Sequence, residues 1–179
     1  FKEALQKGLR GLETGKAGLE WSRKDLPRGK DDLDGLLSRP NAERIFHIKE
    51  AFSRGYTIEK VAGLSGVDPW FLRAIMEIVA FEKDLKRSLR PGVLSEISAG
   101  SGMAEIVREA KRQGFSDRQL AVMTGVSEDE FRLARKKAGI VPVYKLVDTC
   151  SAEFESYTPY YYSSYDDETE TKASGRKKI

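Results

Sequence analysis

The chain has 179 residues, which is enough for one domain of ordinary size and some connecting sequence. Apolar residues make up 40% and charged residues 33%, and no apolar run approaches the roughly 18 residues that a membrane helix needs. The 31 basic and 28 acidic residues give a net charge of +3, which is too small to demand a nucleic acid or an anionic membrane as partner.

The hydrophobic pattern predicts two helices early in the chain, separated by a loop that contains Gly and Pro. The first helix covers residues 1–13 and has no capping residue before it, so we expect it to be the last helix of a preceding unit. The loop covers residues 22–30, and the second helix runs from a cap at Asn41 to Gly55. The apolar stripes of these two helices consist of Leu5, Leu9, Leu12, Ile45, Ile48 and Phe52.

Two stretches of the chain resemble each other at an offset of 59 residues. In each stretch a helix ends at Gly, a short helix follows a Thr or Ser, and a Gly-Val turn leads into another helix. The pairs Ser116 with Gln119 and Ser127 with Glu130 fit the capping-box pattern, which marks the start of a helix. The repeat therefore predicts two similar helix-turn-helix-like units. The matched positions are Gly55/Gly114, Tyr56/Phe115, Thr57/Ser116, Val61/Leu120, Ala62/Ala121, Leu64/Met123, Ser65/Thr124, Gly66/Gly125 and Val67/Val126.

The longest predicted helix begins at Pro69, directly after an Asp68 that can cap it, and continues to Leu89. Its apolar residues cover more of the circumference than a single small core requires. We therefore expect part of this helix to form a self-association surface, with Trp70, Phe81 and Leu89 as candidate positions. The predicted main stripe consists of Phe71, Ile75, Ile78 and Leu85, and Trp70, Ala74 and Phe81 widen it.

The character of the sequence changes after Pro142. Residues 143–147 are rich in β-branched and aromatic side chains and predict a short strand. Five of the seven tyrosines lie between Tyr157 and Tyr165, where we expect them to anchor a connector onto neighbouring protein surface. Residues 166–179 are typical of a mobile, solvated linker. The predicted fold is all-α, a helical bundle with two pseudo-repeated helix-turn-helix-like units plus an extended C-terminal connector.

Residues that could carry catalysis or hold a metal are too few to complete a site. The chain has one histidine, His47, and one cysteine, Cys150, so zinc ligand sets and Cys–His or Ser–His pairs lack members. His47 lies opposite the apolar stripe of its helix and is expected to face water. Residues 100–105 lack the last glycine of a phosphate-binding GxGxxG loop. We therefore predict no catalytic, cofactor-binding or metal-binding residue, and the lone cysteine favours a cytoplasmic location.

The helix, Gly-containing turn and helix also match the outline of a DNA-binding helix-turn-helix, so a tandem nucleic-acid-binding module is the alternative function. The first candidate recognition helix begins with Asp68 and apolar residues, and the second begins with the acidic residues 128–130. DNA phosphates would repel these carboxylates. The basic residues that follow, Arg132, Arg135, Lys136 and Lys137, more simply complement the helix C-terminal dipole and a solvated face. A helical assembly module is therefore favoured, with no nucleic-acid or membrane partner.

A resemblance to a known family rests mainly on residues 147–165. The stretch from Val147 reads VDTCSAEF and the stretch from Thr158 reads TPYYYSSY. They closely resemble the VDTCAAEF and TPYYYSTY segment of the carbamoyl phosphate synthetase large chain, with small departures at Ser151 and Ser164. The first residues, FKEALQKGLRGLE, are similar to the helix that closes the first ATP-grasp half of that family. Residues 114–117 and 142–145 also fit its middle region.

The resemblance implies that residues 23–142 form the helical oligomerisation domain between two homologous ATP-grasp halves. Residues 1–22 would be the trailing helix of the preceding half, and residues 143–179 the connector into the second synthetase half. The family makes carbamoyl phosphate from bicarbonate, ATP and glutamine-derived ammonia, for arginine and pyrimidine synthesis. The implied partners are a second copy, the flanking halves and a glutaminase small subunit. The residues of the parent ligase that bind ATP and Mg or Mn are expected outside this chain, which is then no enzyme alone.

Overall fold

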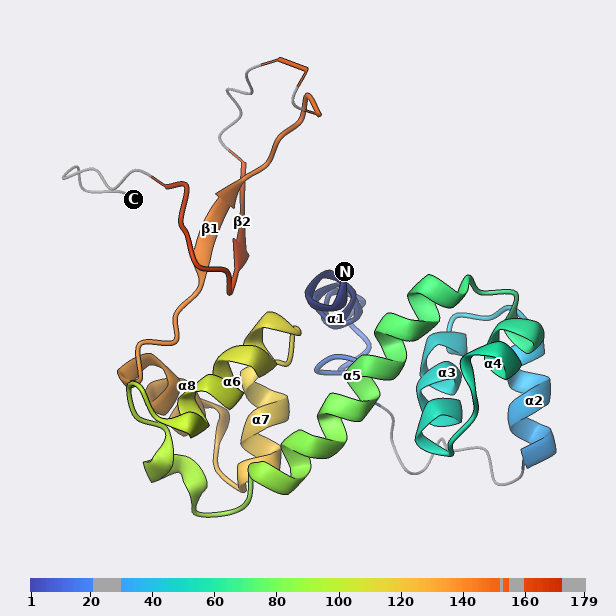
Figure 1. Cartoon of the computed structure of the whole chain (residues 1–179), viewed down its shortest axis with the longest axis horizontal. Helices are drawn as coiled ribbons and strands as arrows, with labels where there is room; N and C mark the ends of the chain where they lie inside the picture. Colours follow the sequence, from blue (N-terminus) through green and yellow to red (C-terminus); the bar gives the residue numbers. More distant parts are fainter. Residues whose placement is uncertain (21–29, 152, 155–159, 172–179) are drawn as a thin grey trace.

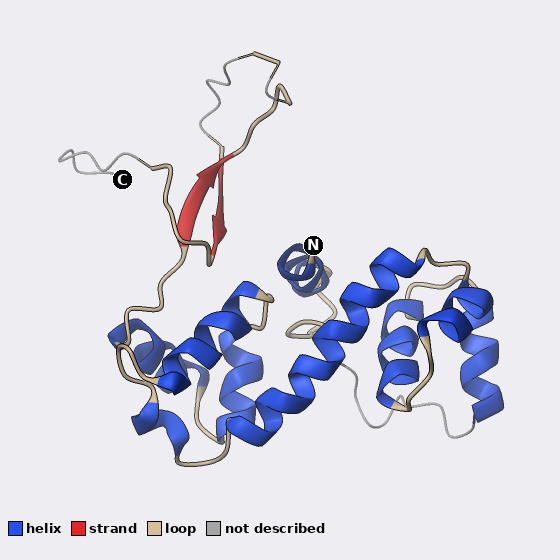
Figure 2. Cartoon of the chain, viewed as in Figure 1, coloured by secondary structure: helices blue, strands red, loops and turns tan. Residues whose placement is uncertain are grey.

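The structure is a computed structural model that describes residues 1–20, 30–151, 153–154 and 160–171. The described residues form helices and one small antiparallel sheet of two strands, so the predicted all-α class is confirmed (Figure 1, Figure 2). The elements are α1 (Lys2–Gly11), α2 (Lys30–Ser38), α3 (Arg44–Ser53), α4 (Ile58–Ser65), α5 (Pro69–Ser88), the 3-10 helix η2 (Val93–Glu96), α6 (Gly102–Arg112), α7 (Asp117–Thr124), α8 (Glu128–Lys137), β1 (Val143–Leu146) and β2 (Tyr161–Ser164).

The internal repeat forms two three-helix units, α3–α4–α5 and α6–α7–α8. The short helices α4 and α7 begin after Thr57 and Ser116, whose hydroxyl groups accept a hydrogen bond from the backbone N–H three residues later. Both helices end at a glycine with left-handed backbone, with φ of 69° at Gly66 and 71° at Gly125. Glycine adopts this conformation without steric strain, which explains its place in both copies. The two predicted capping boxes, at the starts of α7 and α8, are both confirmed.

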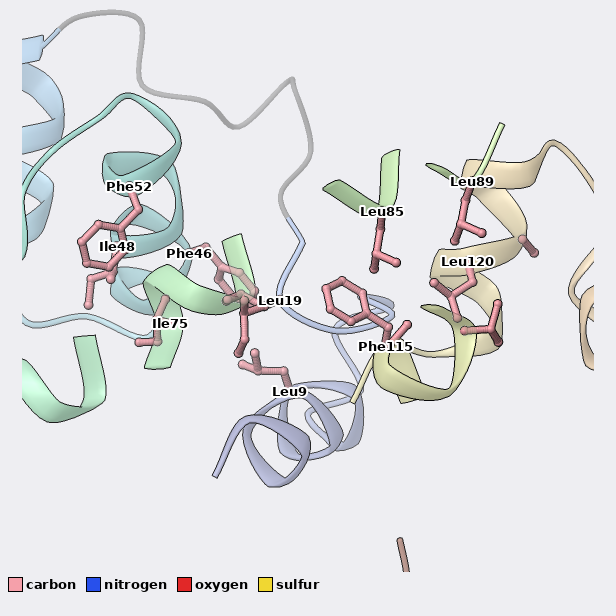
Figure 3. Packing of buried hydrophobic residues seen from close by; sticks show 14 of the residues in the cluster. Leu9, Leu19, Phe46, Ile48, Phe52, Ile75, Leu85, Leu89, Phe115 and Leu120 are labelled. Atoms are coloured by element: carbon pink, nitrogen blue, oxygen red, sulfur yellow. The ribbon is translucent and has the colours of Figure 1, made fainter. Parts of the chain in front are cut away.

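The two units share α5, which has 20 residues and runs diagonally through the helical body (Figure 1). Figure 3 shows Ile75 of α5 close to the side chains of the first unit, and Leu85 and Leu89 directed towards Phe115 and Leu120 of the second. The predicted start of this helix is confirmed, because the Asp68 carboxylate accepts a hydrogen bond from the N–H of Trp70 at 2.7 Å.

The predicted apolar stripe of α5 was wrong at one position. Phe71 is 43% exposed, whereas its neighbour Leu72 is fully buried. Leu72, Ile75 and Ile78 follow each other at three-residue spacing and face α3 and α4, so this face of α5 is the buried one. Phe71 is turned to the surface as a consequence.

Helix α1 lies across the middle of α5 and packs closely on the turn between α6 and α7 (Figure 1). The buried Gln6 donates from Nε2 to the carbonyl of Gln113 at 2.9 Å and accepts at Oε1 from the N–H of Leu19 at 3.4 Å. Gly114 has a φ of 91°, and a Cβ at this position would lie 2.8 Å from the Cα of Glu3. The backbone of α1 therefore rests almost directly on the backbone of this turn.

The structure differs from the sequence-based prediction in the residues that lead into the first unit. Helix α2 was not predicted, and it is anchored to α3 and α4 by Leu33 and Leu37, which are both fully buried. The helix expected from Asn41 begins at Arg44, because Asn41 Oδ1 accepts from the N–H of Glu43 at 2.9 Å and forms a turn ahead of the helix. Of the loop predicted at 22–30, residues 22–29 lie outside the described residues and residue 30 begins α2.

The predicted strand after Pro142 is confirmed, and it pairs with a second strand to form a hairpin that projects from the helical body (Figure 1). Strands β1 and β2 are antiparallel, and Val143 lies opposite Ser164. The N–H of Glu170 donates to the carbonyl of Tyr144 at 2.9 Å, so the chain returns along β1. The linker predicted at 166–179 therefore needs correction over 166–171, and residues 172–179 lie outside the described residues.

We predict that Gly114→Ala destabilises the fold more than Gly55→Ala, its counterpart in the first unit. Both glycines have positive φ, 91° and 84°, so we expect Gly55→Ala to cost about 1–2 kcal/mol through backbone strain. At Gly55 nothing lies within 4 Å of the added Cβ, whereas at Gly114 it meets the backbone of Glu3. Gly114→Ala should therefore cost about 1–3 kcal/mol more. Urea unfolding followed by circular dichroism measures both, and equal losses would contradict the close packing of α1.

Candidate functional site

The three positions predicted for self-association do not share one surface. Trp70, at the start of α5, is 61% exposed, but Leu89 is only 1% exposed. The prediction was wrong for Leu89, because the end of α5 turns this side chain into the core of the second unit (Figure 3). Phe81 is half-buried against the core, and its ring centroid lies 6.0 Å from that of Phe115. Trp70 is therefore the remaining surface candidate of the three.

Trp70 belongs to a group of exposed rings that we call the aromatic patch, formed by Phe1, Trp70 and Phe71. The ring centroid of Phe1 lies 5.3 Å from those of both Trp70 and Phe71, and the latter two are 5.0 Å apart. These tilted and edge-on contacts are favourable arrangements for aromatic rings and hold the patch together. Contiguous exposed apolar groups of this kind commonly mark interaction sites.

Charged side chains of both signs border the aromatic patch. Lys2 Nζ lies 2.6 Å from Glu77 Oε2, and this ion pair joins the start of α1 to α5. A rim that contains both signs can pair with its own copy across a twofold axis, so the electrostatics favour self-association over a strongly charged partner. A depression of about 490 Å³ lies beside the aromatic patch. The charged residues that line it are Lys2, Glu3, Arg73, Glu77, Glu109 and Arg112.

A second group of charged residues, which we call the ion cluster, is buried where α6, α7 and α8 meet. It consists of Lys111, Asp117 and Arg135. Lys111 Nζ lies 2.9 Å from Asp117 Oδ1, and Arg135 reaches both carboxylate oxygens, from Nε at 3.0 Å and from Nη2 at 2.7 Å. Lys111 also donates to the carbonyl of Phe115 at 2.7 Å, and Arg135 to that of Ile140 at 2.5 Å. These additional acceptors make the burial of three charges tolerable.

The ion cluster shifts the pKa values of its members. Burial alone would raise the pKa of Asp117, but the hydrogen bond from Arg135 and the charge of Lys111 outweigh it and hold that pKa below its usual value. Burial lowers the pKa of Lys111 to about 8, against the attraction of Asp117. A lysine with a lowered pKa can serve in catalysis. Here its amino group is enclosed by its own hydrogen-bond acceptors, which indicates a structural role.

Two polar residues expected at the surface are buried instead. His47 lies on α3, on which α2 and α5 both pack. It is buried, and burial lowers its pKa. Arg135, which was assigned to the solvated face of α8, belongs to the ion cluster. Sequence reasoning also missed Asp117, because it lies 18 positions before Arg135 and no local pattern connects the two. Its position in the first turn of α7 was visible, but that position alone indicates only a helix start.

The nucleic-acid alternative gains no support from the geometry of α8. Arg132 lies 2.5 Å from Glu128 and 2.9 Å from Asp129, so its charge is balanced by the acidic first turn of its own helix. Arg135 is buried and paired. The N-terminal end of α8 therefore offers carboxylates where a recognition helix would need groups that attract DNA.

Within the described ranges, no three His, Cys, Asp or Glu side chains lie close enough together to hold a metal ion. The same part of the chain contains no helix that is both long and apolar enough to cross a membrane. The Gly-rich stretch at 100–102 starts α6, and Ser101 Oγ accepts from the N–H of Ala104 at 3.0 Å. That stretch is a helix cap.

Known proteins match this chain over most of its length. The family described as carbamoyl-phosphate synthetase large chain, oligomerisation domain, matches residues 1–139. The carbamoyl phosphate synthase large chain of Archaeoglobus fulgidus is 44% identical over 100% of this chain, which covers 16% of that relative. The large chain of Synechocystis sp. is 43% identical, with the same coverage. The N-terminal section of the large chain of Methanopyrus kandleri is 44% identical over 95% of this chain and 31% of that protein. The chain thus spans 16% of the length of the first two relatives.

We predict that Asp117→Asn lowers the free energy of unfolding by about 3–5 kcal/mol, because Lys111 and Arg135 remain buried without a counter-charge. Asp129→Asn is the matched control. Its carboxylate is 85% exposed and pairs with Arg132 at the surface, so we expect a loss below about 1 kcal/mol. Chemical denaturation at pH 7 compares the two variants with the wild type.

The effect of Asp117→Asn should depend on pH in a defined direction. The folded state lowers the pKa of Asp117, so the ionised carboxylate contributes its full stabilisation above the unfolded value of about 3.8. As the pH falls further, through the folded pKa, this contribution is lost. The difference between wild type and variant should therefore hold from neutral pH to about 4 and shrink below it. A difference that grows on acidification would contradict this assignment.

Proposed function

We infer the role of this chain from its family, because it belongs to the carbamoyl phosphate synthetase large chains as their oligomerisation domain. We propose that it holds two copies of such an enzyme together through the aromatic patch. The observation that carries this proposal is the exposure of Trp70 within a group of three rings. Their mixed-charge rim supports a second copy as the partner, related by a twofold axis.

The names of the relatives and the membership of this family support a proposal about the activity of the longer protein. We infer that it is an ATP-dependent ligase that forms carbamoyl phosphate in the cytoplasm from bicarbonate and glutamine-derived ammonia, for arginine and pyrimidine synthesis. ATP and Mg or Mn would bind to flanking ATP-grasp halves, and a glutaminase small subunit would supply ammonia. Residues 1–22 would close the preceding half, residues 23–142 would form the oligomerisation domain, and residues 143–179 would lead into the second half. This chain would contribute no catalytic residue.

Self-association through the aromatic patch alone should be weak. Each aromatic side chain can bury at most about 150–250 Å², and the three rings are already partly covered by one another. The patch and its copy therefore fall below the roughly 1,200 Å² of a standard stable interface. We expect micromolar or weaker association for this chain by itself, and stronger association where further contacts add to it.

We predict that Trp70→Asp reduces self-association, because it places a charge in the centre of an apolar contact. Sedimentation equilibrium from low micromolar to near-millimolar concentration should show a rising mean mass for the wild type and a lower mass for the variant. Val122→Asp is the control, since Val122 is 78% exposed on α7 and lies outside the patch. Circular dichroism confirms that both variants fold. Equal association of Trp70→Asp and wild type would place the interface elsewhere.

We also predict that Mg-ATP does not stabilise this chain. Neither a phosphate-binding glycine loop nor a cluster of metal ligands occurs in the part of the chain that the structure describes. A ligand present at 100 times its dissociation constant stabilises by about 2.7 kcal/mol, which would raise the melting temperature by several degrees. Thermal unfolding with millimolar Mg-ATP, against magnesium chloride at matched ionic strength, measures this. A clear rise above the salt control would assign an ATP site to the chain.

A further inference from the structure

The residues that follow β2 are attached to the second unit at one place, beside the ion cluster. Tyr165 is half-buried there, with its ring centroid 5.1 Å from Lys111 Nζ and 5.6 Å from Arg135 Cζ. These are distances at which a cation is attracted to the face of a ring. Arg112 Nε donates to the carbonyl of Tyr165 at 3.1 Å, and its Nη2 pairs with Asp167. One ring and one guanidinium group thus hold the base of the hairpin on α6 and α8.

Helix α1 contacts the same segment of the hairpin. Lys7 Nζ donates to the carbonyl of Ser163, and Ser164 Oγ donates to Glu3 Oε2 at 3.3 Å. Lys7 and Glu3 also pair with each other at 2.7 Å, one turn apart on α1. The four residues 163, 164, 165 and 167 therefore connect α1, α6 and α8. We call the side chains that receive them, from Glu3, Lys7, Lys111, Arg112 and Arg135, the hairpin seat.

The hairpin depends on this seat for its stability. Tyr165 is the one residue between 143 and 171 that joins the hydrophobic cluster of the described residues. Tyr144, Tyr161 and Tyr162 are exposed on the strands themselves. A hairpin of two strands is at best marginally stable in water when it stands alone. Since its own strands bury so little, the polar contacts of the seat decide whether it stays closed.

We propose that the hairpin is a latch whose closure is coupled to the docking of α1. The hairpin contacts α1 directly through Ser163 and Ser164, so each segment stabilises the other where they meet. Such coupling is reciprocal: the factor by which the docking of α1 favours the closed hairpin equals the factor by which the closed hairpin favours the docking of α1. The helical body then fixes the position of α1, which precedes the two repeats, relative to the hairpin, which follows them. This inference does not require self-association through the aromatic patch.

Amide hydrogen exchange on the whole chain tests the latch from the side of α1. Lys7→Ala removes the bond from α1 to Ser163. Lys136→Ala is the control, because this lysine is exposed on α8 and the change is again from lysine to alanine. The reporter is the N–H of Val147, which donates to the carbonyl of Tyr160 at 2.8 Å across the hairpin. A charged hydrogen bond of this kind should slow exchange about tenfold, so Lys7→Ala accelerates it by that factor. Lys136→Ala should leave it nearly unchanged.

The reverse direction uses Arg112→Ala, which removes the contacts of the Arg112 side chain with Tyr165 and Asp167. Arg108→Ala is its control, because Arg108 lies one turn earlier on α6 and pairs with Glu105 of the same helix. We expect Arg112→Ala to accelerate exchange in the hairpin about tenfold and to accelerate it measurably in α1. The amides of α4 should keep their wild-type rates, which shows that the body stays folded.

The outcomes separate the parts of the proposal. If the hairpin of the wild type exchanges as fast as an unstructured peptide, or if neither Lys7→Ala nor Arg112→Ala accelerates it, there is no latch. If Arg112→Ala opens the hairpin and α1 keeps its rates, the coupling is wrong. Tyr165→Phe retains the ring and should behave as wild type, whereas Tyr165→Ala should open the hairpin, and equal rates in these two variants would exclude the ring from the seat.

Discussion

The burial of α5 from both units is the constraint on which the rest of the arrangement depends. Each three-helix unit is far too small to enclose a sufficient core alone, because small chains bury a low fraction of their surface. A shared helix solves this problem, since Ile75 serves the first core while Leu85 and Leu89 serve the second (Figure 3). One continuous hydrophobic cluster results, and helix α1 crosses it at the middle of α5, with Leu9 buried there.

Each unit is then held together by buried ion pairs, but those of the two units are not equivalent. In the first unit, Lys49 of α3 lies 2.6 Å from Glu82 of α5 and also donates to the carbonyl of Leu19 at 2.7 Å. In the second unit, Lys111 pairs with Asp117. The offset of the repeat would place Lys49 opposite Arg108, so the two copies share their helix caps and glycines while their cores are locked differently. Such pairs define which helices meet more than they add to stability.

Local signals were enough to predict the repeat, whereas the limits of the buried faces were not predictable. Caps such as Ser127 act on a backbone group three residues away, so sequence alone reveals them. The choice between Phe71 and Leu72 depends on where α3 and α4 lie, because either residue fits an apolar stripe on α5. His47 is likewise buried, on a helix against which the unpredicted α2 packs. For the candidate site, an excess of apolar residues on α5 indicated Trp70, but only the fold brings Phe1 to it.

The proposed association surface and the proposed latch share the first turn of α1 and the last turn of α6. Glu3 lines the depression beside the aromatic patch and also accepts a hydrogen bond from Ser164 of the hairpin. Arg112 likewise borders the depression and holds the carbonyl of Tyr165. A second copy that docks on Phe1 and orders α1 would thereby lower the entropy that hairpin closure still has to overcome. Assembly and hairpin closure would then favour each other. The linkage is positive where docking of the second copy leaves the contacts of Glu3 and Arg112 with the hairpin in place, because both sites then require the same position of α1.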